Sequence, residues 1–418
     1  MNEASAESVS SMVGRWYRVV VDGAGDVDLA LVEEPLDEVA ILDGRIEGPH
    51  AWVDTRAVLI EAEGDGVLYG RAVEQLQPRD GALCFDPAKG GVRTRENRRA
   101  RGAFNALVAE ANRFGMVNTY AHADIAARYI NALLADLGVQ PLPRVGVVVG
   151  AHFGSQLPGY GHGDGDRRSR ELRPLSGGHY RLSTRTTVVP EPLPVAPTGE
   201  IHLGPSRYRK PFAGWPSYLR NAAHNPAIVY HEFGHHVCRH TADFRCNAER
   251  DPEKQRNGKP GIEEGICDYF AASLLRSARP YGWYRADRGR RRDVEELRFA
   301  VEPSDDADAH AVGAAWAPAF WRSRSELCDA GLLNAPEDHD RALLHALLQI
   351  GESAGSRKRN SRRRREAKRT EPSTVLSYYL DALTDSGGRR AAGRAEAVFA
   401  RVGLLDGAKR PVEVSTSC

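Results

Sequence analysis

The sequence has no long hydrophobic run and no surplus of charge of one sign. Its longest apolar stretches, such as 145–150, are far shorter than the roughly 20 residues of a membrane helix, so no membrane span is expected. With 57 basic and 56 acidic residues, the net charge of +1 excludes a globally basic nucleic-acid coat and an acidic disordered chain. The 41 glycines follow no three-residue period, which excludes collagen.

Cysteine is also scarce. The six cysteines are scattered along 418 residues and form no Cys-x-x-Cys pair, so free thiols are expected. The first twenty residues contain two Glu and no apolar core of a secretory signal. Together these features predict a cytoplasmic protein.

Composition and periodicity divide the chain into four segments. Residues 1–85 contain short Val- and Ile-rich runs between Gly, Asp and Pro, which predicts a β-rich module. Residues 86–102 are polar, basic and glycine-containing, as expected of a linker. Residues 103–405 begin with apolar positions at helical spacing, continue with strands such as 145–150, and become mostly helical. Residues 406–418 form a tail.

One low-complexity run stands out at 357–369, where nine of thirteen residues are basic. The simplest interpretation is a solvated loop between two helices. The run contains no aromatic residue, so stacking on single-stranded nucleic acid is not expected. A contact with an acidic partner is the alternative.

One predicted helix carries the pattern of a metal site. Asn225 is a suitable N-cap and Pro226 suits the first helical position, so a helix is expected from here to about Arg239. His231 and His235 are four residues apart and therefore share one face of that helix. This spacing allows two imidazoles to bind one Zn²⁺.

Carboxylate side chains lie next to this histidine pair in the sequence and on the following predicted helix. Glu232 directly follows the first histidine, where it can take a proton from water at the metal. A catalytic zinc also needs a third protein ligand and an open position. The Pro260-Gly261 turn predicts a second helix, on which Glu264 and Asp268 share a face. One of these carboxylates would bind the metal and the other would accept a hydrogen bond from a ligand histidine.

The neighbours of these residues are assigned ordinary roles. Glu264 is preferred to Glu263 as the ligand because it shares a face with Asp268 and precedes a glycine. Glu263 is therefore expected to be a solvated neighbour. Cys267 is expected to be a small buried residue rather than a thiolate ligand. A third histidine ten residues after His231 is excluded, since that position is a threonine.

The combined motifs resemble the gluzincin metallopeptidases, in particular the thermolysin- and fungalysin-like group. The resemblance is carried by His-Glu-Phe-Gly-His at 231–235, Glu-Gly-Ile-Cys-Asp at 264–268 and His-Ala-Val-Gly-Ala-Ala-Trp at 310–316. It covers roughly residues 103–405. It implies an α+β, zincin-like fold of two lobes, one β-containing and one mostly helical, with residues 1–85 as an N-terminal extension.

The resemblance implies zinc-dependent hydrolysis of peptide bonds in a peptide or protein substrate. The metal ligands that it implies are two helix histidines and one carboxylate, namely His231, His235 and Glu264. Glu232 would be the general base, and His310 would donate a hydrogen bond to the oxyanion of the transition state. Asp268 would orient one ligand histidine, for which His231 is preferred.

Two points leave alternatives open. Family members commonly have an Asn-Ala-aromatic edge strand that anchors the substrate backbone, whereas Glu200-Ile-His202-Leu stands here. A catalytically silent zinc-binding or scaffold protein is therefore the alternative to a peptidase, and a module recruited to an acidic partner by 357–369 is a third class. Residues 1–85 could be an inhibitory prosegment, a substrate-docking module or an extension of the β lobe.

Overall fold

The computed structural model describes residues 10–55, 58–63, 67–72, 76–87, 101–154, 172–174, 177–181, 198–204, 221–251, 254–256, 258–281, 292–300, 308–353 and 361–405. Three features of the sequence lie wholly or partly outside these ranges: most of the predicted linker 86–102, residues 357–360 of the basic run and the tail 406–418.

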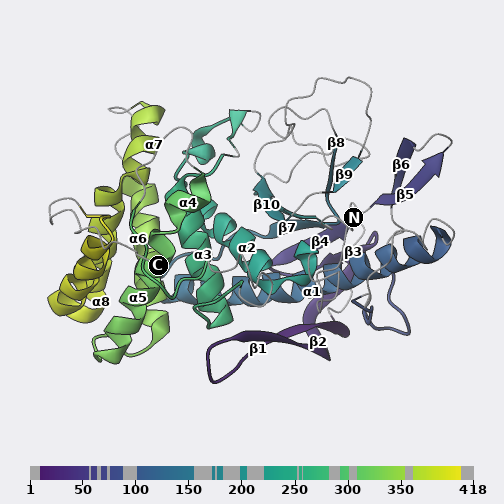
Figure 1. The fold of residues 1–418 in the computed structure, drawn as a ribbon, viewed down its shortest axis with the longest axis horizontal. Helices are drawn as coiled ribbons and strands as arrows, with labels where there is room; N and C mark the ends of the chain where they lie inside the picture. The colour runs from purple at the N-terminus through teal and green to yellow at the C-terminus, as the bar shows by residue number, and fades with distance from the viewer. Residues whose placement is uncertain are drawn as a thin grey trace, which may run out of the picture. The chain divides into compact units, whose positions relative to one another are not determined.

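The chain is a mixed α+β protein, as predicted, with most of its strands before most of its helices (Figure 1). The strands are β1 Ser10–Val21, β2 Val27–Leu42, β3 Arg45–Glu47, β4 Ala51–Thr55, β5 Val58–Glu63, β6 Val67–Ala72, β7 Val145–Val149, β8 His152–Gly154, β9 Leu172–Pro174, β10 Gly178–Arg181 and β11 Glu200–Leu203. The α-helices are α1 Arg101–Asp136, α2 Pro226–His240, α3 Gly261–Leu275, α4 Ala309–Gly313, α5 Trp316–Asp329, α6 Pro336–Ser353, α7 Arg362–Thr370 and α8 Pro372–Arg401.

The main sheet joins strands from both sides of the predicted linker. Its order is β1-β2-β3-β4-β7-β11-β10, and β7 pairs in parallel with both β4 and β11. The sequence of β7, Val-Gly-Val-Val-Val, is buried throughout, as expected for a central parallel strand. Because β4 comes from residues 1–85, the pairing supports the third alternative for this segment, an extension of the β region.

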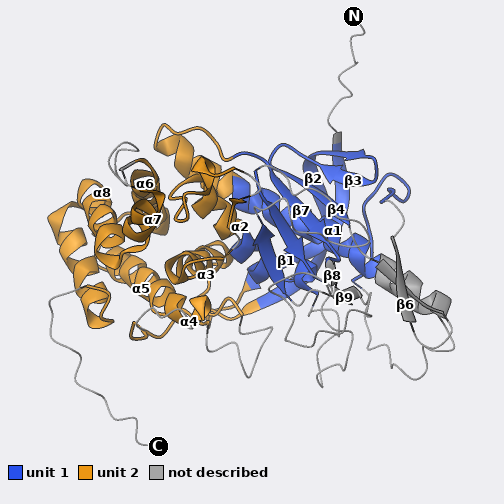
Figure 2. Cartoon of the chain, turned by 90° about the horizontal axis from the view of Figure 1, so that it is seen from above, with its two compact units in different colours: residues 1–20, 28–127, 143–232 blue, residues 21–27, 128–142, 233–418 orange. Residues whose placement is uncertain are grey.

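The described chain forms two compact units, coloured separately in Figure 2. Unit 1 contains residues 1–20, 28–127 and 143–232, and unit 2 contains residues 21–27, 128–142 and 233–418. The boundary falls inside α1 and, after Glu232, inside α2, and so does not follow the predicted linker. Since α2 is one continuous helix, His231 and Glu232 keep a fixed helical spacing to His235 across the boundary.

In unit 1, two buried histidines fix the start of α2. His224 Nε2 lies 2.7 Å from the carbonyl oxygen of Ala111 on α1. His122 on α1 lies 2.8 Å from the Tyr230 hydroxyl on α2 and 2.9 Å from the Tyr17 carbonyl oxygen on β1. Burial lowers the pKa of both histidines to about 4, so both rings are neutral at pH 7.

In unit 2, α3, α6 and α8 enclose a polar network that contains Asp340 and His339. The Asp340 carboxylate accepts hydrogen bonds from the hydroxyl groups of Tyr269 and Ser273 on α3. His339 lies 2.7 Å from the Tyr269 hydroxyl and 2.5 Å from the Tyr379 hydroxyl on α8. All five side chains are buried. The network therefore supplies hydroxyl partners to an acid and a histidine that water does not reach.

The prediction of a solvated loop at 357–369 is wrong for its described part. Ser361 accepts a hydrogen bond from the Arg364 amide, and helix α7 begins at the next residue, Arg362. Arg365 and Arg369 are buried, because acidic and carbonyl groups of unit 2 surround them. A charge-rich run thus forms a docked helix.

Two further sequence expectations concern composition. The cysteines of the described ranges are free thiols, as predicted. None of the helices within those ranges combines the length and apolar composition that crossing a membrane requires.

Candidate metal centre

Helix α2 begins as its sequence predicts. The Asn225 side chain accepts a hydrogen bond from the Ala227 amide over 3.0 Å and caps the helix, with Pro226 in its first turn. His231 and His235 are buried on consecutive turns of this helix. The helix therefore presents two imidazoles at the spacing that a single metal ion requires.

Helix α3 brings two carboxylates to the same place. It starts after Pro260, whose backbone is extended, and has Glu263 and Glu264 in its first turn. Both side chains are almost fully buried, with 2% and 3% exposure. The positive end of the helix dipole favours negative charge at these two positions.

Helix α4 lies against α3 through glycines. A Cβ atom on Gly265 would lie 2.7 Å from the carbonyl oxygen of Gly313, and one on Gly313 would lie 2.7 Å from the Gly265 amide nitrogen. Only glycine permits such an approach between the two backbones. The contact places His310, one turn before Gly313, beside Glu264. It also gives a physical reason for the glycines of Glu-Gly and His-x-x-Gly in this chain.

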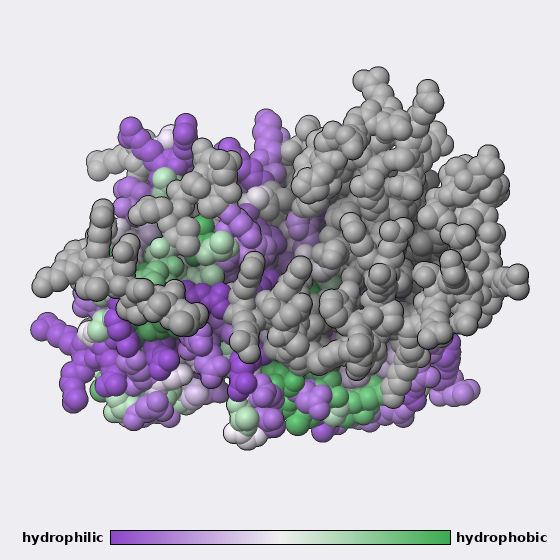
Figure 3. Space-filling model, viewed as in Figure 1, coloured by the Kyte–Doolittle hydropathy of each residue, from purple (hydrophilic) through white to green (hydrophobic). Residues whose placement is uncertain are grey.

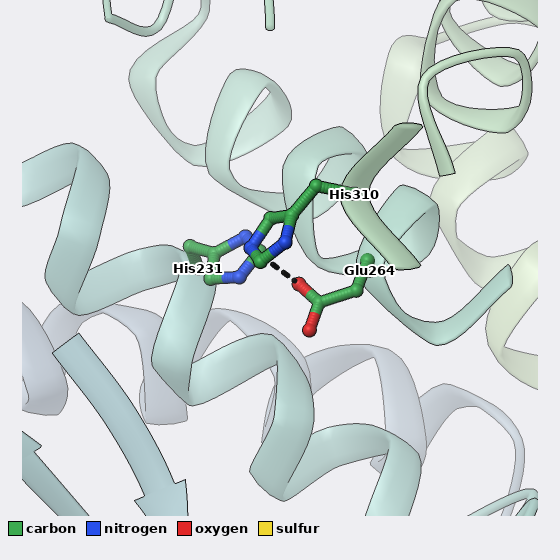
Figure 4. Close-up of side chains that lie close together, drawn as sticks. All are labelled: His231, Glu264 and His310. Carbon is green, nitrogen blue, oxygen red and sulfur yellow. Dashed lines mark ion pairs between the residues drawn. The ribbon is translucent and has the colours of Figure 1, made fainter. Parts of the chain in front are cut away.

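Three imidazoles surround the carboxylate of Glu264. Ligand atoms of His231, Glu264 and His310 all lie within 4.8 Å of one another, and Figure 4 shows these three side chains. The Glu264 Oε2 atom is 3.3 Å from His310 Nε2 and 3.6 Å from His235 Nε2. This group could hold a metal ion. Of the three predicted ligands, His231 and Glu264 belong to this group, and its third member is His310, which the sequence predicts as a hydrogen-bond donor. The remaining predicted ligand, His235, lies beside the group through its 3.6 Å approach to Glu264.

The neighbouring Glu263 is buried, so the prediction of a solvated side chain is wrong. It was expected to be solvated, but its buried carboxylate accepts hydrogen bonds from His235 Nδ1 and from Arg245, each over 2.9 Å. Burial opposes ionisation of Glu263, yet the Arg245 guanidinium and the His235 hydrogen bond outweigh burial and lower the carboxyl pKa. An ionised Glu263 fixes the proton of His235 on Nδ1, which leaves Nε2 as the ligand atom facing Glu264.

Cys267 is buried, as predicted, and its exclusion from the metal ligands stays a prediction. Its Sγ atom lies 3.2 Å from His235 Nδ1, the nitrogen that faces Glu263. Burial raises the pKa of this thiol well above its usual range.

Asp268 has a partner that the sequence did not suggest. Its carboxylate accepts hydrogen bonds from Arg292, one of them 3.0 Å long from Nε, and from the Tyr281 hydroxyl over 3.3 Å. The Arg292 guanidinium also stacks over the Tyr281 ring. The role given to Asp268, orientation of His231, stays a prediction. No sequence motif marks Arg292 as the partner of Asp268. Glu263, by contrast, could have been identified as a partner of the site, because it directly precedes Glu264 in the sequence.

The general-base candidate Glu232 lies beside the sheet of unit 1. A Cβ atom on Gly178, at the start of β10, would lie 2.6 Å from Glu232 Cγ and 2.7 Å from Oε1. β10 is the last strand of the described sheet, whereas Glu200 and His202 lie on β11, inside it. The strand next to Glu232 is therefore β10, not the segment compared with the family's edge strand.

The donor set fits a divalent transition metal. Imidazole nitrogen and carboxylate oxygen are ordinary ligands of Zn²⁺. With the proton of His235 held on Nδ1, its Nε2 lone pair faces a carboxylate oxygen 3.6 Å away in buried surroundings. Two lone pairs in this arrangement repel unless a positive charge lies between them. A bound cation supplies that charge.

In comparisons with known proteins, no family model matches the chain, and no curated protein matches it.

Proposed function

We propose that the chain is a zinc-dependent metallopeptidase. The observation that carries the proposal is the convergence of His231, His235 and His310 on Glu264, with Glu232 on the same helix as the first two. Three of these residues, His231, His235 and Glu264, would hold Zn²⁺. When bound, the ion supplies a Lewis acid that acidifies water and polarises a carbonyl group.

In this proposal His310, although it belongs to the group of ligand atoms, serves as a hydrogen-bond donor. Its side chain is 46% exposed, whereas the three ligands are buried. Asp308 lies 3.2 Å from His310 Nδ1 and orients the ring. A fourth protein ligand would also close the position that a catalytic zinc site keeps open. His310 therefore stabilises the developing oxyanion.

Glu232 carries the proton in this scheme. Its carboxylate takes a proton from the attacking water molecule and passes it to the leaving amine. Glu232 is only 4% exposed, which keeps this carboxylate away from bulk water. Glu263 holds the His235 imidazole in position through its hydrogen bond to Nδ1. Arg245 in turn holds Glu263.

A peptide is the proposed substrate because β10 begins against Glu232. An extended peptide that pairs with a strand exposes its carbonyl groups at regular spacing along that strand. Pairing with β10 would bring one such carbonyl to the general base. This is the step that the zincin-like resemblance assigns to an edge strand, here placed on Gly178–Arg181 instead of Glu200–Leu203.

The test is metal analysis combined with digestion of a peptide library by the full chain. We expect one zinc ion per chain and cleavage that a chelator abolishes. The Glu232→Gln variant should keep the zinc ion and lose hydrolysis, because it removes the base and no ligand. Zinc binding without cleavage in the unaltered chain would favour the silent scaffold, and full activity of the variant would remove Glu232 from the mechanism.

A further inference from the structure

Helix α7 is held in place by its two buried arginines. Arg369 donates to the carbonyl oxygens of Asp243 and Gly351 over 2.8 and 2.7 Å. Arg365 forms an ion pair with Glu249. These contacts hold the helix against the segment that connects α2 to α3. The remaining basic side chains of α7 are exposed, and Figure 3 shows hydrophilic side chains over this helix at the upper left.

A cavity of about 1080 Å³ lies between α7 and that connecting segment. Its lining residues are Phe244, Arg245, Arg250, Arg256, Gly258, Lys259, Pro260, Arg362, Arg363, Glu366, Ala367 and Thr370. Six of them are basic and one is acidic, so the walls carry a strong positive surplus. All belong to unit 2.

The single acid of the lining does not balance these charges, and of the six basic residues Arg245 pairs with Glu263 outside the lining. Glu366 forms ion pairs with both Arg250 and Arg256, the second over 3.4 Å. Burial and the positive charges of Arg256 and Arg362 lower the pKa of Arg250 even so. The walls therefore repel one another, and an anion bound between them would relieve the repulsion.

Arginine predominates in the lining, which favours phosphate. Guanidinium groups bind phosphate oxygens through two parallel hydrogen bonds, a geometry that lysine lacks. The volume suits a ligand larger than one phosphate group. The basic residues also occupy two walls, Arg362 and Arg363 on α7 and the others on the connecting segment, so a ligand with two linked phosphates can meet both.

We propose that this cationic cavity binds a diphosphate-bearing anion. None of the proposed metal ligands lines this cavity, and its lining residue Arg245, which pairs with Glu263, is left unchanged in the test below. Inorganic pyrophosphate and the diphosphate of a nucleotide present the same chemistry to these side chains.

Calorimetric titration of the full chain with inorganic pyrophosphate at physiological salt tests the proposal. We expect one binding site per chain and an affinity about tenfold weaker in the Arg256→Gln/Arg363→Gln variant. The matched control is Arg364→Gln/Lys368→Gln, which removes the same charge from exposed positions of α7 outside the lining. The control should bind like the unaltered chain.

Absence of pyrophosphate binding would overturn the proposal, and so would equal loss of affinity in the two double variants. Unchanged affinity in both variants would also overturn it, because the anion would then bind elsewhere, for instance at the metal centre. Titration with a nucleoside diphosphate distinguishes the two sources, since tighter binding than pyrophosphate identifies a nucleotide. An octaglutamate peptide that binds better than pyrophosphate would assign the cavity to an acidic peptide instead.

Discussion

Unit 2 contains two buried polar clusters whose partners differ in kind. The Asp340 carboxylate faces hydroxyl groups, each of which can donate a hydrogen bond. The Glu264 carboxylate faces imidazole nitrogens at 3.3 and 3.6 Å, and one of these belongs to the half-exposed His310. The first cluster joins its acid to hydroxyl donors of the protein, whereas the second brings ligand atoms together at a place that could hold a metal ion. The comparison separates a cluster that stabilises the fold from one that is arranged for chemistry.

The largest expected effect comes from breaking the first cluster. The Asp340→Ala substitution leaves buried hydroxyl groups without their acceptor and Arg324 without its carboxylate, which should cost about 3–5 kcal/mol of stability. Urea unfolding measures the loss. Asp385→Ala, at an exposed position of α8, is the control. Zinc content and turnover per folded molecule should not change, and a selective loss of turnover would contradict the structural role.

Next in size is the effect of His310. The His310→Ala substitution should reduce kcat about 10²–10³-fold and change KM much less, because it removes a donor to the oxyanion. Zinc content distinguishes the two possible roles of this ring. If zinc stays bound at one ion per chain, His310 is a donor, and if zinc is lost, it is a ligand.

The Glu263→Gln substitution should have a smaller effect at the same centre. It removes the charge that holds His235 Nδ1 and pairs with Arg245, so zinc affinity should fall about 10–100-fold. Competition with a chromophoric chelator gives the affinity. Glu396→Gln, an exposed position on α8, should leave it unchanged. An unchanged affinity in the Glu263 variant would limit this residue to a structural role.

The smallest effect concerns pH and unit 1. His122 and His224 have pKa values of about 4 in the fold and near 6.5 when unfolded, so the unfolded chain binds more protons below pH 6.5. Their contribution makes stability fall as pH drops from 6.5 towards 4, and it adds no slope above that window. Urea unfolding between pH 6.5 and 5 should show a dependence that His122→Gln reduces by up to one proton. An unchanged slope would mean that the His122 ring is protonated in the fold.

The sequence predicted the elements whose signals are local. Asn225 and Pro226 predicted the start of α2, and the Pro-Gly turn predicted the start of α3. Both helices are found at the expected residues. Their apolar periodicity also placed Ile266 and Phe270 in the core. Such signals are encoded within a few residues of the element that they define.

What the sequence could not show depends on distant partners. The pairing of β4 with β7 joins residues about ninety positions apart, and no local pattern encodes it. The burial of Glu263 depends on the rotation of α3 relative to Arg245, and the docking of α7 depends on Glu249 and Asp243. Tertiary contacts turned a charge run that favours solvent into a fixed helix.

The backbone contact between Gly265 and Gly313 has a consequence for how metal binding and catalysis are linked. Neither glycine has a side chain that could bind metal or donate a proton, yet together they determine how near α4 comes to α3. A methyl group added at Gly313 would meet the backbone atoms of Gly261 and Gly265, so α4, which carries His310, would have to shift. Ion uptake and bond cleavage could then be uncoupled by a change in neither a ligand nor a catalyst.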